Sequence, residues 1–211
     1  EIYHTNNPHQ IIIATESSPI EPYRNEVKYP TTKEWKLVAG GDLYSYRTIL
    51  NPNKITIKSF DKKEYTIQKG MDPAYSPNVE LYVNNTKKLT INQVEKSDDL
   101  QKYKSSFYGM GMGYHDIPTF QGVELDHVMS NVIETLDKTW MEEGLVCFVG
   151  VDDYRAVYSY SELFNRTDQQ QAILSIPANP KVSGYYRVYL PSRFWADYSV
   201  KGLREIYLFM D

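Results

Sequence analysis

Cysteine is nearly missing from this sequence: its 211 residues include one, Cys147. A single cysteine excludes an internal disulfide framework and any structural zinc site built from several thiolates. Cys147 lies in the apolar run LVCFV at residues 145–149, where a free thiol usually behaves as a small buried hydrophobe. We therefore expect a core position rather than a reactive thiol, because apolar burial raises the pKa of a thiol.

Long apolar runs and an excess of charge of one sign are missing as well. No stretch approaches the roughly 20 apolar residues needed to span a bilayer, so no transmembrane segment is expected. The formal net charge is −4, and the basic residues are scattered along the chain. Such a charge pattern lacks the positively charged patch that binds phosphate backbones, so a nucleic-acid partner is not expected.

Motifs of common enzymes and metal sites are also absent. The sequence has no nucleophile elbow, P-loop, dinucleotide-binding fingerprint or haem-attachment motif. The neighbouring pairs His115-Asp116 and Asp126-His127 lack the i, i+4 spacing that places two metal ligands on one helical face. The sequence therefore indicates no catalytic residue and no metal ligand.

What is present is typical of a globular protein, with 41% hydrophobic and 24% charged residues. Residues 1–33 are rich in proline and polar residues, which predicts an irregular N-terminal extension. Residues 34–211 alternate short β-like runs with turn residues, which predicts a single mixed α+β domain with many short strands and a few helices. The predicted strands are residues 35–39, 54–60, 64–68, 79–83, 145–151, 155–158, 172–176, 185–190 and 205–210.

Helices are predicted at three places. The strongest pattern is an apolar stripe with i, i+3, i+4 spacing that starts just after Gly122. Its members are Leu125, Val128, Met129, Val132, Ile133 and Leu136. Two pairs, Thr90 with Gln93 and Ser159 with Glu162, have the spacing of a capping box and predict that short helices begin there.

Five segments of the C-terminal half carry a resemblance to a known family. They are FQGVEL at residues 120–125, FVGVDDYRA at 148–156, YSYSEL at 158–163, RVYLP at 187–191 and SVKGLREI at 199–206. In this order they resemble the molybdopterin-binding domain of sulfite-oxidase-type oxidoreductases and their small periplasmic relatives. The likeness is clearest over residues 81–207. It implies the α+β fold of that family, a molybdopterin cofactor, and an extracytoplasmic location, periplasmic or secreted.

The sequence departs from the family at positions that matter for chemistry. Catalytic members hold molybdenum through a cysteine in the segment that corresponds to residues 92–121, which here contains none. Ser105 and Ser106 lack the softness of a thiolate, so ligation of molybdenum by cysteine is not expected. At two further positions the sequence has Gly202 where the family has tryptophan and Asp153 where it has glycine. Whether the protein binds molybdopterin without the metal ligand stays open.

Seven residues are candidates for binding a cofactor or ligand. The resemblance places Lys201 at a cofactor-facing position, and Tyr154, Arg155 and Arg187 on neighbouring family segments. Arg193, which is not one of the seven, lies near the same segments. Cations suit the negatively charged oxygens of a phosphate ligand, although ordinary surface cations would give the same pattern. The alternating glycines Gly109, Gly111 and Gly113 allow close approach of the backbone to a ligand, or form a flexible loop.

These features favour a non-catalytic binding module that recognises a small anionic ligand or a partner protein. The binding cleft is expected between the 109–113 loop and the Lys201 segment. Two alternatives stay open: a molybdopterin-dependent oxidoreductase, or a subunit of one, without a cysteine metal ligand; and a structural interaction domain.

Overall fold

The computed structural model describes residues 11–15, 35–39, 49–55, 57, 76, 78–104, 106, 108–109, 113–114, 116–117, 119–166, 168–176, 186–191 and 199–210. The chain divides into two compact units, Glu1–Phe60 and Asp61–Asp211. The domain boundary that the sequence predicts near residue 33 stays a prediction. Among the described residues, no helix is long and apolar enough to cross a membrane.

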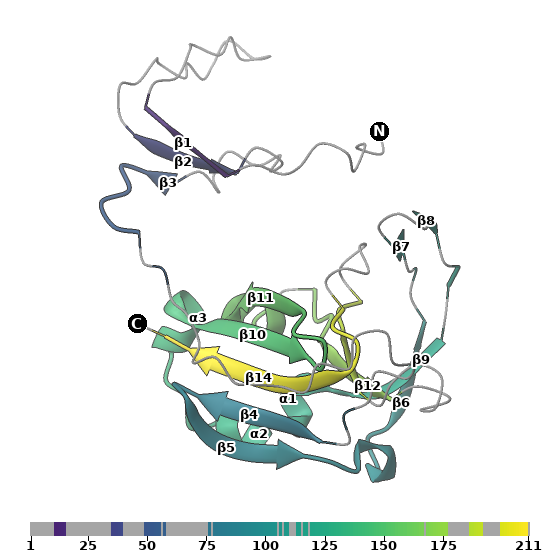
Figure 1. Cartoon of the computed structure of the whole chain (residues 1–211). Coiled ribbons are helices and arrows are strands. Elements are labelled where there is room, and N and C mark those ends of the chain that lie inside the picture. Colours follow the sequence, from purple (N-terminus) through teal and green to yellow (C-terminus); the bar gives the residue numbers. More distant parts are fainter. Residues whose placement is uncertain are drawn as a thin grey trace. The chain divides into compact units, whose positions relative to one another are not determined.

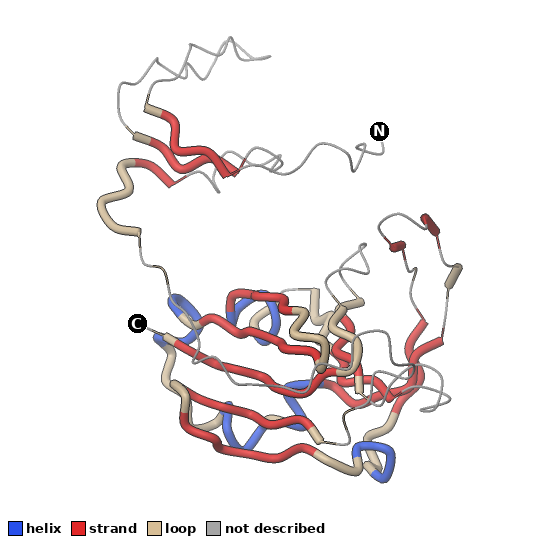
Figure 2. Tube along the Cα trace, viewed as in Figure 1, coloured by secondary structure: helices blue, strands red, loops and turns tan. Residues whose placement is uncertain are grey.

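The first unit contains a three-stranded antiparallel sheet. Its order is β1 (Ile11–Ala14), β2 (Lys36–Ala39) and β3 (Ile49–Leu50), drawn in red in Figure 2. The strand predicted at residues 35–39 is thereby confirmed. The strand predicted at 54–60 is wrong in its described part, because Lys54, Ile55 and Ile57 pair with no strand. The strand predicted at 64–68 lies outside the described residues.

The second unit is a mixed α+β domain rich in strands, and its larger sheet has five of them (Figure 1). The order is β11 (Arg155–Ser159), β10 (Leu145–Gly150), β14 (Leu203–Phe209), β4 (Val79–Val83) and β5 (Thr86–Ile91). Only β14 and β4 run parallel among these pairs. The strands predicted at 79–83, 145–151, 155–158 and 205–210 are confirmed. Strand β5 was not predicted from the sequence.

A second, four-stranded antiparallel sheet has the order β13 (Arg187–Tyr189), β12 (Ile173–Ile176), β9 (Thr119–Glu124) and β6 (Gln101–Lys104). Between β6 and β9 in the chain, β7 (Tyr108–Gly109) and β8 (Gly113–Tyr114) form a separate two-stranded hairpin. The strands predicted at 172–176 and 185–190 are confirmed over their described residues.

One hydrophobic core joins the two sheets. Alternate residues of β10 and β14 face it, such as Val146, Phe148 and Ile206, and the middle residues of β9, β12 and β13 meet them: Val123, Leu174 and Val188. All of these side chains are buried. Because a strand shows successive side chains to opposite faces, each sheet keeps a second set of residues away from this core.

The apolar stripe at residues 125–136 is helical, as predicted, but forms two short helices. These are α1 (Leu125–Val128) and α2 (Ser130–Ile133), separated at Met129, whose backbone (φ −104°, ψ 4°) leaves the α-helical range. Leu125, Met129 and Val132 are buried, and the other stripe residues are partly buried against the same core. The stripe therefore packs as expected.

The remaining helices test the two capping boxes. Ser159 and Glu162 form the predicted box: the Ser159 hydroxyl accepts from the Glu162 N–H at 3.2 Å, and the Ser159 N–H donates to the Glu162 carboxylate at 3.1 Å. This box opens α4 (Tyr160–Phe164). The box predicted at Thr90 is wrong, because Thr90 pairs within β5 and the 3₁₀ helix η2 (Val94–Lys96) begins after Gln93 without a side-chain cap. Helix α3 (Thr139–Glu143) has no counterpart among the predicted elements.

Candidate functional site

Two of the candidate cations lie opposite each other on neighbouring segments. Arg187, the first residue of β13, forms an antiparallel β-bridge with Lys201. Backbone hydrogen bonds flank the bridge: the Val188 N–H donates to the Val200 carbonyl at 3.2 Å, and the Leu203 N–H donates to the Tyr186 carbonyl at 2.9 Å. Residues paired in this way project to the same side of the strands, so the two cations share one side of the bridge.

The turn between β10 and β11 borders the same segment. The Val151 N–H donates to the Gly202 carbonyl at 2.9 Å. Gly150 passes close to it, because a Cβ on Gly150 would lie 3.0 Å from the Lys201 carbonyl oxygen. The structure thus brings the turn that carries Tyr154 and Arg155 next to the Arg187–Lys201 bridge.

Within the turn, both aromatic and basic side chains reach the surface. Tyr154 is exposed, and the Arg155 guanidinium forms an ion pair with Asp153 at 2.8 Å. Asp153 itself has φ +66°, the left-handed conformation that glycine adopts most easily.

The surroundings of Arg187 are less polar than water. Desolvation by burial lowers the pKa of the Arg187 guanidinium from its ordinary value, while Lys201 is exposed. The two cations therefore sit in different surroundings, one partly buried and the other exposed.

The glycine segment is less closely connected to this place. Gly109 pairs with Gly113 in the β7–β8 hairpin, whereas Gly111 and Arg193 lie outside the described residues. Gly113 has φ +76°, and a Cβ on it would meet no atom within 4 Å, so its position does not require close packing. One hydrogen bond links β13 to the segment before the hairpin, from the Tyr189 hydroxyl to the Ser106 carbonyl at 3.2 Å.

The thiol that molybdenum chemistry requires has no suitable equivalent. Cys147 lies in β10 and is fully buried, as predicted, and desolvation raises the pKa of its thiol to about 11. A thiol with so high a pKa is a poor source of the thiolate that binds metal. Within the described part of the chain, no three His, Cys, Asp or Glu side chains are grouped so as to hold a metal ion. Thiolate-ligated molybdenum therefore does not fit these residues.

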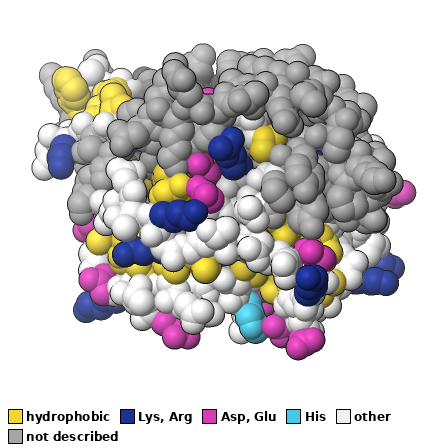
Figure 3. Space-filling model, turned by 60° about the horizontal axis from the view of Figure 1, so that its bottom comes forward, with side chains coloured by type: hydrophobic (Ala, Val, Ile, Leu, Met, Phe, Trp, Pro, Cys, Tyr) yellow, Lys and Arg dark blue, Asp and Glu magenta, His cyan; other side chains and the backbone are white. Residues whose placement is uncertain are grey.

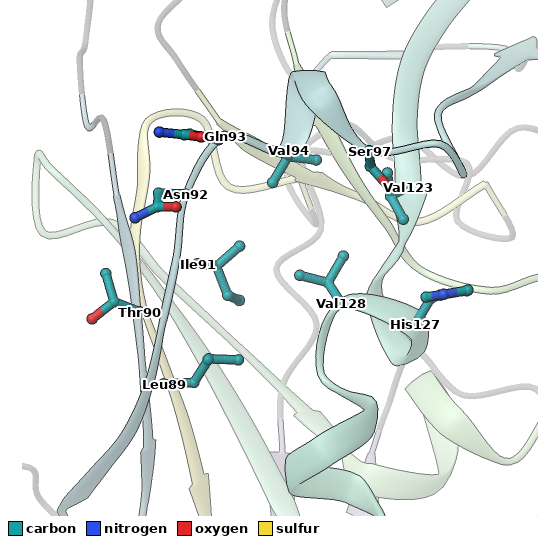
Figure 4. A pocket seen from close by; sticks show the side chains of 10 residues that line it. All are labelled: Leu89, Thr90, Ile91, Asn92, Gln93, Val94, Ser97, Val123, His127 and Val128. Carbon is teal, nitrogen blue, oxygen red and sulfur yellow. The ribbon is translucent and has the colours of Figure 1, made fainter.

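A pocket of about 250 Å³ lies elsewhere, between β5, η2 and α1 (Figure 4). Its lining consists of residues 89–94 with Ser97, Val123, His127 and Val128, and none of the seven predicted site residues takes part. At its edge, His127 Nε2 lies 3.2 Å from the carboxylate of Asp99. Sequence reasoning missed this pocket because its residues read as ordinary core and turn positions.

No protein-family model matches the chain, and no curated protein matches it. The resemblance to the sulfite-oxidase-type domain thus stays a prediction based on its motifs.

Proposed function

We propose that this protein is a non-catalytic binding module on a sulfite-oxidase-type molybdopterin-binding fold, placed outside the cytoplasm, and that it takes a small anionic ligand at the Arg187–Lys201 bridge. The observation that carries the proposal is the pairing of these two cations across adjacent segments. The mixed α+β fold and the nearby Tyr154–Arg155 turn are compatible with it.

The chemistry of the bridge suits a phosphate-like or carboxylate group. An arginine offers a planar set of N–H donors that can contact two oxygens of one anion, and a lysine adds a mobile point charge. An anion between Arg187 and Lys201 could contact both cations. Burial disfavours the charged form of Arg187, and an adjacent anion would favour it.

A binding role is preferred to redox catalysis because of the donor set. The single cysteine is buried in β10 with a raised pKa, so no described side chain provides the soft thiolate of catalytic members. Metal analysis of protein purified from a host that makes molybdopterin separates the two functions. Stoichiometric molybdenum would contradict the binding-module proposal.

Isothermal titration with inorganic pyrophosphate and with sulfate tests the anion site. Lys201→Ala should weaken binding at least about tenfold, because a charge-assisted contact is worth about 1.5–3 kcal/mol. The matched control is Lys88→Ala, another exposed lysine of the second unit, which should bind as the unmutated protein does. Equal affinities of the two variants, or no binding of either anion by the unmutated protein, would remove the support for this site.

A further inference from the structure

The pocket between β5, η2 and α1 combines aliphatic side chains with an almost equal share of polar lining. In Figure 4, Leu89, Ile91, Val94 and Val128 point toward the space between the strand and the helix, whereas Thr90 and its polar neighbours point away from it. This follows from the alternation of side chains along β5. A ligand in the pocket would therefore contact aliphatic side chains on several sides.

The volume sets the size of such a ligand. The pocket has about 250 Å³, and an apolar cavity of roughly 150 Å³ is already sufficient to bind benzene. Drug-sized ligands occupy pockets of about 300–1,000 Å³. The space therefore suits a molecule with one aromatic ring and a short substituent.

The edge of the pocket selects the charge of that substituent. Asp99 lies at this edge, beside His127. The backbone N–H of Asp99 donates to the Ser97 hydroxyl at 3.2 Å. The segments 95–99 and 124–127, which border the pocket, carry five carboxylates against one fixed cation, Lys96, and the titratable His127: the acids are Glu95, Asp98, Asp99, Glu124 and Asp126. Figure 3 shows acidic side chains beside the histidine on this face. A negative edge attracts a cation and repels an anion.

We propose that this pocket binds a small aromatic amine, with its ring among Ile91, Val94 and Val128 and its ammonium group beside Asp99. The site is separate from the Arg187–Lys201 bridge, which favours the opposite charge. Lys201→Ala should accordingly leave amine binding unchanged, so that either proposal can fail without the other.

Three probes that share one ring test the charge preference: 2-phenylethylamine, 2-phenylethanol and phenylacetate. In titrations followed by amide chemical shifts, the amine should bind most tightly, with a Kd on the order of 1 mM, and phenylacetate most weakly. The shifted amides should include those of Ile91, Val94 and Val128. Equal affinities for the amine and phenylacetate, or no shifts at these amides, would overturn the proposal.

Two variants test the location. Val128→Phe should fill the pocket and weaken binding of the amine at least tenfold, whereas Val157→Phe, at a position on β11 that is 53% exposed, should have no effect. Asp99→Asn changes an exposed side chain and should weaken the amine about two- to fivefold without affecting the alcohol. Its control is Asp116→Asn, at an exposed residue outside the pocket lining. Unchanged amine affinity in Asp99→Asn, or in folded Val128→Phe, would refute the site.

Discussion

Two residues beside the Arg187–Lys201 bridge have left-handed backbone conformations. Asp153 occupies a left-handed conformation at φ +66°, and its ion pair with Arg155 helps to hold the turn. Gly202 has φ +60°, where a tryptophan side chain would be strained. Asp153 thus forms a turn that a glycine would also form, and Gly202 lies where a bulky residue would not fit easily.

The carboxyl of Asp168 provides a residue-scale prediction about pH. The Arg166 side chain donates to Asp168, at 2.8 Å from Nε to Oδ1, and the Gln170 N–H adds a second donor; together they lower the pKa of Asp168 to about 2. A lowered pKa stabilises the folded protein above the ordinary carboxyl value near 4, and this contribution is lost as the pH falls through about 2. Because Asp168 is exposed, the effect on stability is small.

Carboxyl carbon NMR can follow this group directly. The unmutated protein should show a midpoint near 2 for Asp168, and Arg166→Ala should raise it toward the ordinary value, since the main donor is removed. Other aspartate midpoints in the same titration serve as the control. A midpoint near 4 before mutation would show that the hydrogen bonds do not persist in solution.

Residue types in the sequence were enough to suggest part of the candidate site. Arg155, Arg187 and Lys201 were named from the motif segments, and the structure brings those segments together. The pocket at Ile91 and Val128 was not foreseeable, because aliphatic residues on a strand and a helix are normally core. Only their arrangement in space leaves a volume between them.

At the scale of elements, the contact between β9 and β12 depends on one glycine. A Cβ on Gly122 would lie 2.5 Å from the Leu174 carbonyl oxygen and 2.8 Å from the Ser175 Cα. Both atoms belong to the backbone of the paired strand, so they cannot move without disturbing the sheet. The same part of the sheet supports the stacked rings of Phe120 and Tyr189, whose centroids are 4.1 Å apart.

Gly122→Ala should therefore destabilise the protein by about 3 kcal/mol, at the upper end of the cost of overpacking. Urea unfolding measures this change. Gly113→Ala is the control: its Cβ meets open space, and only the positive φ opposes it, at a cost of about 1 kcal/mol. Equal losses of stability in the two variants would mean that β9 and β12 are not as close as the structure places them.

The α1–α2 segment supplies a second prediction at this scale. Val132 is 8% exposed in the core, so Val132→Asp buries a charge without a partner and should cost about 3–5 kcal/mol. Asn131→Asp places a carboxylate on the exposed neighbouring residue of α2 and should change stability by less than about 0.5 kcal/mol. Thermal unfolding of both variants decides the assignment, and an unchanged Tm for Val132→Asp would contradict it.

Elements with regular apolar patterns could be predicted from the sequence, and elements without them could not. Residues 79–83 and 145–151 were recognised as strands because their inward side chains are aliphatic or aromatic. The polar strand β6, with the sequence QKYK, was missed because it forms one edge of its sheet and shows mostly polar side chains. The strand predicted at 54–60 has the pattern of a strand but no partner for its described residues, and pairing is decided by tertiary structure.

At the scale of the whole molecule, the hydrophobic core belongs to one unit. Its buried members run from Val79 to Leu208 and include residues of both sheets and of the helices that pack on them. The division into Glu1–Phe60 and Asp61–Asp211 therefore leaves this core within the second unit. The Arg187–Lys201 bridge and the pocket at β5 and α1 lie in this unit as well.

The fragment Asp61–Asp211 should consequently fold without the first unit. A domain with one continuous core of this kind unfolds cooperatively, and its stability arises mainly from that core. We expect the fragment to show a single unfolding transition in urea, with a midpoint matching that of a reporter in the core of the full chain, such as the indole N–H resonance of Trp140, which is 5% exposed. The fragment Glu1–Phe60 is the control. Adding it to the fragment Asp61–Asp211 should leave the unfolding midpoint of Trp140 unchanged. A second-unit fragment that lacks a cooperative transition would mean that residues 1–60 complete the core, and the anion and amine sites would then need the whole chain to form.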